Sequence, residues 1–121
     1  MEENKREKCQ VFQVSDLIGK KWTIPLLQEI NCQKEKGFNF FFKRMAKISP
    51  KILSQRLKDL EKSGLITKRK VNDSVKIITQ YTISNKGIEL LKIVDYLRRW
   101  NEKYNGKEHC TTTKCVECEL Y

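Results

Sequence analysis

One stretch of the chain, SPKILSQRLKDLEKSGLI (residues 49–66), carries side chains whose types and spacing suit the recognition of DNA. Lysine can reach guanine acceptors or phosphates, glutamine can pair with adenine, and serine can bond to more than one base edge. The free N–H groups at the start of a helix can also hold a phosphate. We expect this stretch to form a helix whose DNA-facing residues are Ser49, Lys51, Ser54, Gln55, Lys58 and Lys62.

The other side of this predicted helix is apolar, which determines how the DNA-facing side is held. Three leucines recur at spacings of four and three, so that they share one helical face: Leu53, Leu57 and Leu60. Ser49 followed by Pro50 is a favoured start of a helix, and Gly64 stands where many helices end. The leucine face is therefore expected to be buried and the basic face to remain exposed.

A predicted β-hairpin follows this helix directly. The runs LITKRKV (65–71) and VKIITQYTI (75–83) are separated by a short polar segment, which is typical of two paired strands. Alternation in the second run predicts that one side is buried: Val75, Ile77, Tyr81 and Ile83. Such a hairpin can lie along or within a minor groove next to the recognition helix. Its basic residues are Lys68, Arg69, Lys70 and Lys76.

The remaining elements complete a fold that positions these residues. Helical periodicity predicts helices over residues 11–18, 21–31 and 40–48, with Gly19 as a left-handed end of the first and Asn39 as the cap of the third. The aromatic run of the third helix is expected in the core. Ser84 caps a long last helix that reaches about Tyr104. The predicted fold is mainly α (α+β): a winged helix-turn-helix with four helices, a β-hairpin wing and a long C-terminal helix.

The charge of the chain is concentrated around the predicted recognition helix. The net charge is +10, and ten basic but only two acidic residues lie between Lys43 and Lys70. Clustered positive charge favours binding to a polyanion. A generally lysine-rich proteome explains the composition equally well, but it does not explain the clustering.

Length and hydropathy predict a single domain that works in the cytoplasm. A chain of 121 residues can bury a hydrophobic core without disulfides. It contains no apolar run long enough to span a membrane, and its charged start, MEENKREKCQ, does not resemble a secretory signal. We expect a tail over residues 1–9, the winged helix-turn-helix DNA-binding domain over 10–104, and a cysteine-rich tail over 105–121.

Several motifs together resemble the HxlR-type winged helix-turn-helix regulators, which are relatives of the MarR-like repressors. They include Cys9 ahead of the first helix, DLIGKKW (16–22), GFNFFFKRM (37–45), ISPKILSQRLKDLEKSGLITKR (48–69), YTISNKGIELL (81–91) and Trp100. The resemblance covers about Cys9 to Trp100. Two positions depart from the family pattern, because Gln10 stands where proline usually follows the cysteine and the wing lacks proline.

The resemblance implies a sequence-specific regulator of transcription that binds double-stranded DNA, acting as a repressor. Such proteins are homodimers that join through the first and last helices and bind pseudopalindromic operators. The last helix carries an apolar stripe that suits a dimer face or a core equally well: Leu90, Val94, Leu97 and either Trp100 or Asn101, with Ile93 and Tyr96 beside it. Recognition helices about 34–36 Å apart would enter successive major grooves.

The five cysteines suggest two further roles. Several relatives sense oxidants through the N-terminal cysteine, and Cys9 follows the basic residues Lys5, Arg6 and Lys8, as reactive thiols often do. The tail HCTTTKCVECELY offers four soft metal ligands: His109, Cys110, Cys115 and Cys118. A CxxC pair is typical of zinc sites, but free thiols and a disulfide remain alternatives for the tail.

Two other functions compete with a specific regulator. One is an architectural protein that covers DNA without regard to sequence. The other is a metal or redox protein whose basic face docks an acidic protein. An enzyme is not expected, because the sole histidine, His109, lies in the tail and the sequence shows no phosphate-binding glycine-rich loop or acid–base pair.

Overall fold

The computed structural model describes residues 8–33, 35–45 and 47–106 of the chain. Over these residues the chain forms five helices and one antiparallel hairpin, in the predicted order. The elements are α2 (Gln10–Ile18), α3 (Thr23–Cys32), α4 (Phe38–Arg44), α5 (Pro50–Lys62), β1 (Ile66–Asn72), β2 (Ile77–Ile83) and α6 (Asn85–Asn105). The predicted winged helix-turn-helix fold is confirmed.

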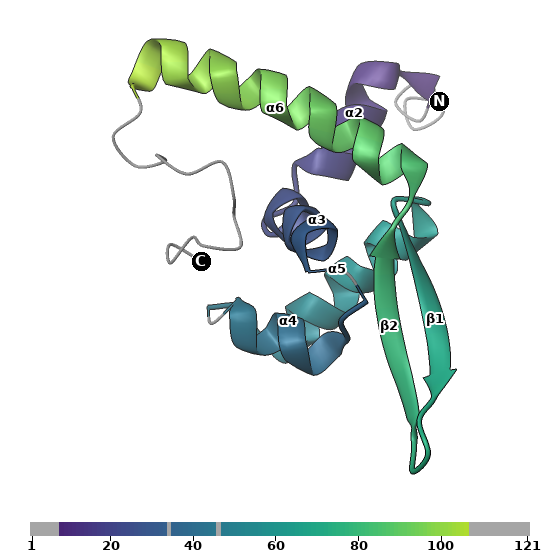
Figure 1. Cartoon of the computed structure of the whole chain (residues 1–121). Helices are drawn as coiled ribbons and strands as arrows, with labels where there is room; N and C mark the ends of the chain where they lie inside the picture. The colour runs from purple at the N-terminus through teal and green to yellow at the C-terminus, as the bar shows by residue number, and fades with distance from the viewer. Residues whose placement is uncertain (1–7, 34, 46, 107–121) are drawn as a thin grey trace.

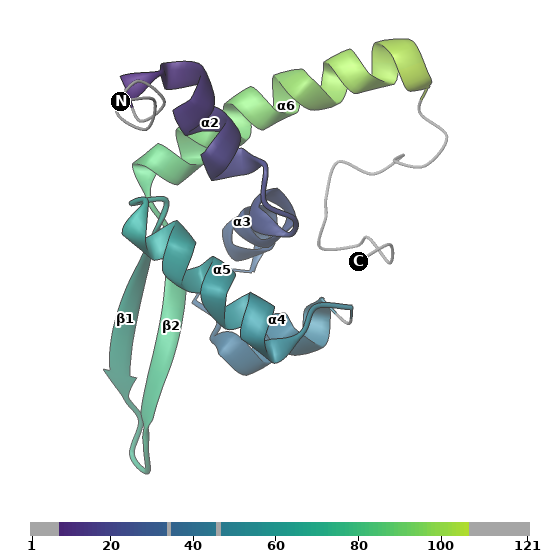
Figure 2. The same cartoon turned by 180° about the vertical axis from the view of Figure 1, so that it is seen from behind.

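Three helices and the root of the hairpin form the body of the molecule. Figures 1 and 2 show α3, α4 and α5 packed together, with the hairpin extending past them as a wing. Helices α2 and α6 lie at the opposite end from the tip of the wing (Figure 1). In the described part of the chain, no helix is both long and apolar enough to cross a membrane.

The core lies where α3, α4 and α5 meet the root of the wing. Every member of the predicted leucine face is buried there. The leucines pack among residues from the neighbouring elements; the buried apolar set is Leu26, Leu27, Ile30, Phe41, Met45, Ile48, Leu53, Leu57, Leu60, Leu65, Ile66 and Tyr81. Because burial of apolar side chains is the main force that stabilises a fold, this contact sets the orientation of α5.

The start of α5 is capped by a local hydrogen bond, as the sequence predicts, whereas its end is bonded to residues at the start of α6. The Ser49 hydroxyl accepts a hydrogen bond from the Ile52 N–H at 3.1 Å. At the other end Gly64 adopts a left-handed φ of 75°, and its carbonyl accepts a 2.6 Å hydrogen bond from the Ser84 hydroxyl. The Lys86 ammonium donates to the Ser63 carbonyl at 2.7 Å. The end of α5 is therefore tied to the start of α6.

The turn between α2 and α3 differs from the prediction. Gly19 has a right-handed φ of −79°, so the expected left-handed end was wrong. Glycine is needed there for space, because a Cβ would lie 2.5 Å from the Ser15 carbonyl oxygen. The left-handed conformation falls on Trp22 instead, with a φ of 78°, which is uncommon for a residue with a side chain.

Helix α4 also departs from the prediction. Gly37 caps it rather than Asn39, and the helix ends at Arg44 rather than at residue 48. Contact with the wing accounts for the early start: the Lys36 carbonyl accepts a 3.0 Å hydrogen bond from the Tyr81 N–H, which pins this segment against β2. Of the aromatic run only Phe41 is fully buried, and Phe42 is exposed, so the prediction of a wholly buried run was wrong.

A buried ion pair joins α3 to α4. The Glu29 carboxylate is fully buried, and Arg44 Nε lies 3.2 Å from its Oε2. Burial raises the pKa of Glu29 above its ordinary value of 4.5, and the nearby Arg44 guanidinium opposes that rise only in part. The pair escapes sequence analysis because glutamate is rarely expected inside a core.

Glu29 is expected to make stability depend on pH in an unusual direction. Because the folded pKa is raised, the contribution of Glu29 is fully present below pH 4.5 and is lost as pH rises through the folded value. Urea unfolding of the wild-type and Glu29→Gln proteins between about pH 4 and pH 8 measures this effect. We expect the stability of wild type relative to the variant to fall as pH rises. A constant or rising difference would contradict the argument.

Candidate nucleic-acid interface

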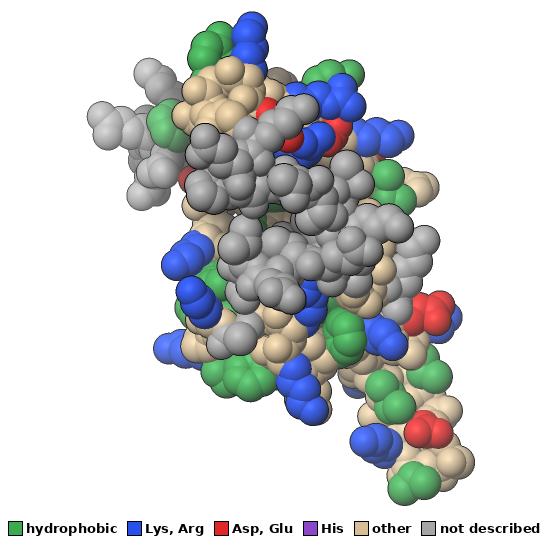
Figure 3. Space-filling model, turned by 60° about the vertical axis from the view of Figure 1, so that its left-hand side comes forward, with side chains coloured by type: hydrophobic (Ala, Val, Ile, Leu, Met, Phe, Trp, Pro, Cys, Tyr) green, Lys and Arg blue, Asp and Glu red, His purple; other side chains and the backbone are tan. Residues whose placement is uncertain are grey.

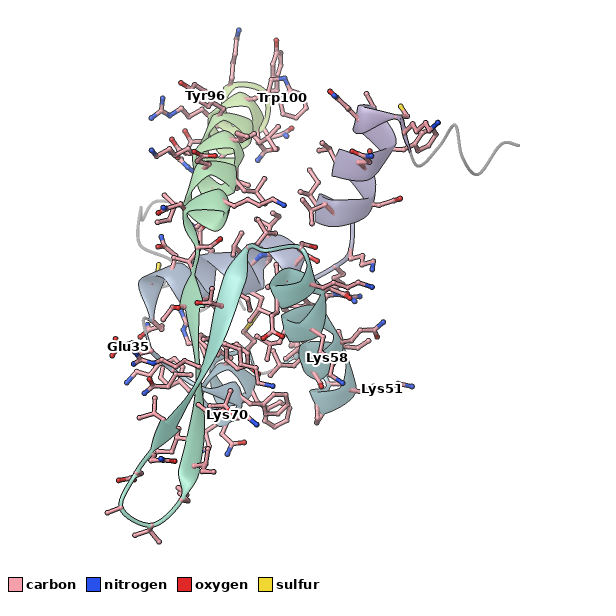
Figure 4. The ribbon with its side chains drawn as sticks, turned by 90° about the vertical axis from the view of Figure 1, so that its right-hand side faces the viewer. Glu35, Lys51, Lys58, Lys70, Tyr96 and Trp100 are labelled. Atoms are coloured by element: carbon pink, nitrogen blue, oxygen red, sulfur yellow. The ribbon has the colours of Figure 1, made fainter. Side chains whose placement is uncertain are left out.

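The predicted recognition face of α5 is presented to solvent. Lys51, Gln55, Lys58 and Lys62 are exposed on the side of the helix opposite the buried leucines, while Ser54 is half-buried at its margin. Figure 4 shows Lys51 and Lys58 on α5 and Lys70 on the wing in the same half of the molecule, away from Tyr96 and Trp100. The Ser49 hydroxyl caps the helix by accepting the hydrogen bond from the Ile52 N–H. It therefore stabilises the start of α5 and also places a polar group there.

Arg56 and Asp59, which the sequence leaves unassigned, hold α5 against the turn before α3. Arg56 Nε donates a 2.8 Å hydrogen bond to the Lys21 carbonyl, and Arg56 Nη1 lies 3.5 Å from Asp59 Oδ2. Asp59 also pairs with Lys20 at 3.5 Å. These contacts lie next to the left-handed Trp22. They fix the helix on its neighbours, which spacing along α5 alone does not reveal.

The register of the hairpin separates the basic residues of the wing. Lys68 pairs with Tyr81 and Lys70 with Thr79, so both lysines share the face that carries the core residues at the root. Arg69 pairs with Gln80 on the other face, and its Nη2 lies 3.4 Å from the Gln80 Oε1. Lys76 is exposed in the turn. The four residues predicted as one set therefore lie on two faces and at the tip.

A shallow pocket lies between the end of α5 and the wing. It is lined by Glu61, Gly64, Ile66, Thr67, Lys68 and Lys70. The two lysines thus stand next to α5 in space as well as in sequence. A surface built from an exposed helix and an adjoining hairpin matches the major groove of DNA together with a neighbouring minor groove.

Of the two cysteine sites predicted from the sequence, the structure describes Cys9 but not the ligands in the tail. Cys9 is the N-cap residue of α2 and is half-buried, and Cys32 is exposed at the end of α3. Among the residues that the structure describes, no three His, Cys, Asp or Glu side chains are grouped so as to hold a metal ion. The predicted metal ligands lie outside the described residues and stay a prediction: His109, Cys110, Cys115 and Cys118.

Helices α2 and α6 leave large apolar side chains in solvent. No residue of α2 is buried, and Gly87 is the one buried residue of α6. The exposed side chains are Val11, Phe12 and Val14 on α2, and Ile88, Ile93, Tyr96, Leu97, Trp100 and Tyr104 on α6. The apolar stripe of the last helix, which the sequence assigned either to a core or to a dimer face, is thus largely uncovered within one copy of the chain.

The sequence and the fold of the chain are similar to those of known proteins. The family model described as HxlR-like helix-turn-helix matches residues 17–109. Two uncharacterized HTH-type transcriptional regulators of Bacillus subtilis (strain 168) are similar: YdeP is 33% identical over 101 residues, covering 84% of this chain and 77% of the relative. YdzF is 31% identical over 90 residues, covering 74% and 82%. The solved structure of the redox regulator HypR in its oxidized form has a TM-score of 0.68 and 27% identity, covering 80% of this chain and 98% of that one. The chain belongs to the HxlR-like helix-turn-helix family of transcriptional regulators.

Proposed function

We propose that the chain binds a specific double-stranded operator as a homodimer and represses transcription by occupying it. The observation that carries the proposal is the two-sided construction of α5. Its leucines are buried in the core, while Lys51, Gln55, Lys58 and Lys62 remain exposed beside a basic wing. Exposed lysine and glutamine side chains on a firmly held helix suit base contacts in the major groove.

The uncovered apolar surfaces support the homodimer. On α6, the exposed residues Ile93, Leu97, Trp100 and Tyr104 recur at spacings of three and four. That spacing places them on one side of the helix, as in helices that pack against a second helix. A contiguous apolar surface of this kind is typical of a protein interface. A two-fold arrangement through α2 and α6 would present two copies of α5 to a pseudopalindromic site.

A redox or metal response is a second part of the proposal. Cys9 begins α2, whose apolar side chains belong to the proposed dimer surface, so that a modified thiol would lie next to it. The similar HypR structure bears the description of a redox regulator. Selection of operator duplexes from a random pool, run with and without reductant, tests this response, and zinc analysis of the purified protein tests the tail ligands.

Gln55→Ala and Lys58→Ala are each expected to reduce discrimination between the operator and unrelated DNA by roughly tenfold, because each removes a base contact worth about 1–3 kcal/mol. Lys68→Ala is expected to weaken both kinds of DNA alike, since a phosphate contact carries no sequence information. Selection of duplexes from a random pool with purified full-length protein supplies the operator, and titration of each variant on selected and scrambled duplexes measures the ratio.

The same titrations distinguish the alternatives. A protein that binds every duplex with equal affinity would be an architectural protein, and the proposal would be wrong. Binding that falls steeply with added salt is expected in either case, because lysine contacts with phosphates release counterions. The ratio between the two duplexes, rather than the affinity for one of them, therefore decides between the two functions.

A further inference from the structure

Two aliphatic side chains are exposed at the far end of the wing. Alternation in the sequence predicts that Val75 and Ile77 share the buried side of the strand, and the structure shows that this was wrong. The exposed fraction of Val75 is 89% and that of Ile77 is 65%. The wing extends past the body at this point, so no core reaches them (Figure 1). Figure 3 shows hydrophobic side chains at the tip of the wing, next to basic and acidic ones.

The turn that carries Val75 is held in shape by its backbone. The Asp73 N–H donates a 2.8 Å hydrogen bond to the Lys76 carbonyl, which closes the loop. The Asp73 carboxylate accepts a 2.8 Å hydrogen bond from the Ser74 N–H. A closed turn of this kind presents the Val75 side chain in a defined position, and the exposure of Val75 follows from that position.

Ile77 shares a face of the hairpin with two basic residues. It pairs with Asn72 at the end of the ladder, and Lys70 and Lys68 follow on the same face towards the root. At the tip itself Lys76 is balanced by Asp73, so the attraction of a polyanion comes mainly from Lys68 and Lys70. The face thus combines positive charge near the recognition helix with an apolar end.

The minor groove next to the proposed major-groove site is chemically complementary to this face of the wing. Phosphates line the rims of the minor groove, and its floor differs between base pairs in one group: a G·C pair carries the guanine N2 amino donor, whereas an A·T pair has no such group. An aliphatic side chain cannot accept a hydrogen bond from that amino group. Contact with it would leave a buried donor unpaired, which is unfavourable.

We propose that Val75 and Ile77 contact the floor of the minor groove on each outer side of the operator and favour A·T over G·C pairs there. The inference rests on the proposed DNA-binding function and adds a second source of sequence preference to it. Lys68 and Lys70 contact the phosphate rims without regard to sequence. Apolar side chains inserted between base steps from the minor groove are known among DNA-binding proteins.

Base analogues separate the amino group from every other difference between the pairs. The probe is the duplex selected from a random pool by the wild-type protein, prepared with four kinds of pair at the outer ends of the protected region. These are A·T, G·C, inosine·cytosine, which lacks the N2 amino group, and 2,6-diaminopurine·thymine, which adds it. We expect the wild-type protein to bind the A·T and inosine probes about tenfold more tightly than the other two, the size of a typical single-pair discrimination.

Variants of the tip identify the residues responsible. The double variant Val75→Ser with Ile77→Ser is expected to bind all four probes alike, because serine can accept a hydrogen bond from the amino group. Lys70→Gln is the control, and it is expected to weaken binding to all four probes by the same factor. Since both aliphatic side chains are exposed, the double variant should keep the thermal stability of the wild type.

Each outcome decides the inference. Equal binding of the wild type to all four probes overturns it. If the double variant still separates the probes, another feature such as groove width is recognised, and the inference is also wrong. Failure of the selection to yield any preferred duplex is a different result, because it would contradict the proposed function itself.

Discussion

Replacing Gly87 by alanine is expected to lower the free energy of unfolding by about 3 kcal/mol. Gly87 is the one buried residue of α6 and lies in the first turn, three residues after the Ser84 cap, where its N–H donates a 3.1 Å hydrogen bond to the Ser84 hydroxyl. A Cβ at this position would lie 2.4 Å from the Leu65 carbonyl oxygen and 2.6 Å from Ile83 Cγ1. The backbone oxygen cannot move without disturbing the junction of α5, the wing and α6.

Gly64→Ala is the matched control, because it introduces backbone strain without a steric clash. Gly87→Ala introduces the clash. Gly64 has a left-handed φ of 75°, but the nearest atom to an added Cβ is Lys86 Cδ at 3.8 Å, an ordinary van der Waals contact. Its cost is therefore limited to backbone strain of about 1 kcal/mol. Urea unfolding of the wild type and both variants measures the two losses. Equal losses would show that the close approach at Gly87 is not the dominant cost.

In the proposed dimer, the substitution Leu97→Asp is expected to separate the two copies into monomers and to weaken operator binding about 100-fold. Leu97 is 48% exposed within one copy and lies between Ile93 and Trp100 on the apolar side of α6. In the proposed dimer a carboxylate would be buried at this position without a partner, which is strongly unfavourable. A monomer offers only one copy of α5, so the affinity gained from contacting two half-sites together is lost.

Lys92→Gln is the control for Leu97→Asp, because both substitutions change the charge by one negative unit. Lys92 is exposed but lies on a different side of α6, in the pocket that also contains Asn31 and Asp95. We expect it to leave both the mass in solution and operator binding close to the wild-type values. Light scattering after size exclusion and titration on the selected duplex measure the two properties. A dimeric Leu97→Asp protein would contradict the proposed interface.

Much of α5 could be predicted because its signals are local. Ser49, Pro50 and Gly64 determine where α5 starts and ends through hydrogen bonds and backbone conformations within a few residues. The spacing of its leucines determines which face is buried. Since a helix with one apolar face must place its other face in solvent, the positions of Lys51 and Lys58 followed from the same pattern.

The wing was predicted less completely, because alternation along a strand does not show how far the core extends. Tyr81 is buried as expected, whereas Val75 and Ile77 lie beyond the body and are exposed. Alternation does place Arg69 on the opposite face from Lys68 and Lys70, yet the three were grouped because they are adjacent in sequence. The register of the hairpin corrects that grouping.

Sequence by itself determined the order of the elements, the winged helix-turn-helix class and the two faces of α5, since periodicity, capping residues and turns act over short distances. Only the tertiary structure decided which groups meet across the fold: Glu29 with Arg44, Arg56 with the Lys21 carbonyl, and Lys36 with Tyr81. Such contacts depend on how separate elements pack in three dimensions. The same packing decided where the core ends, and it thereby left the tip of the wing and the apolar side of α6 uncovered.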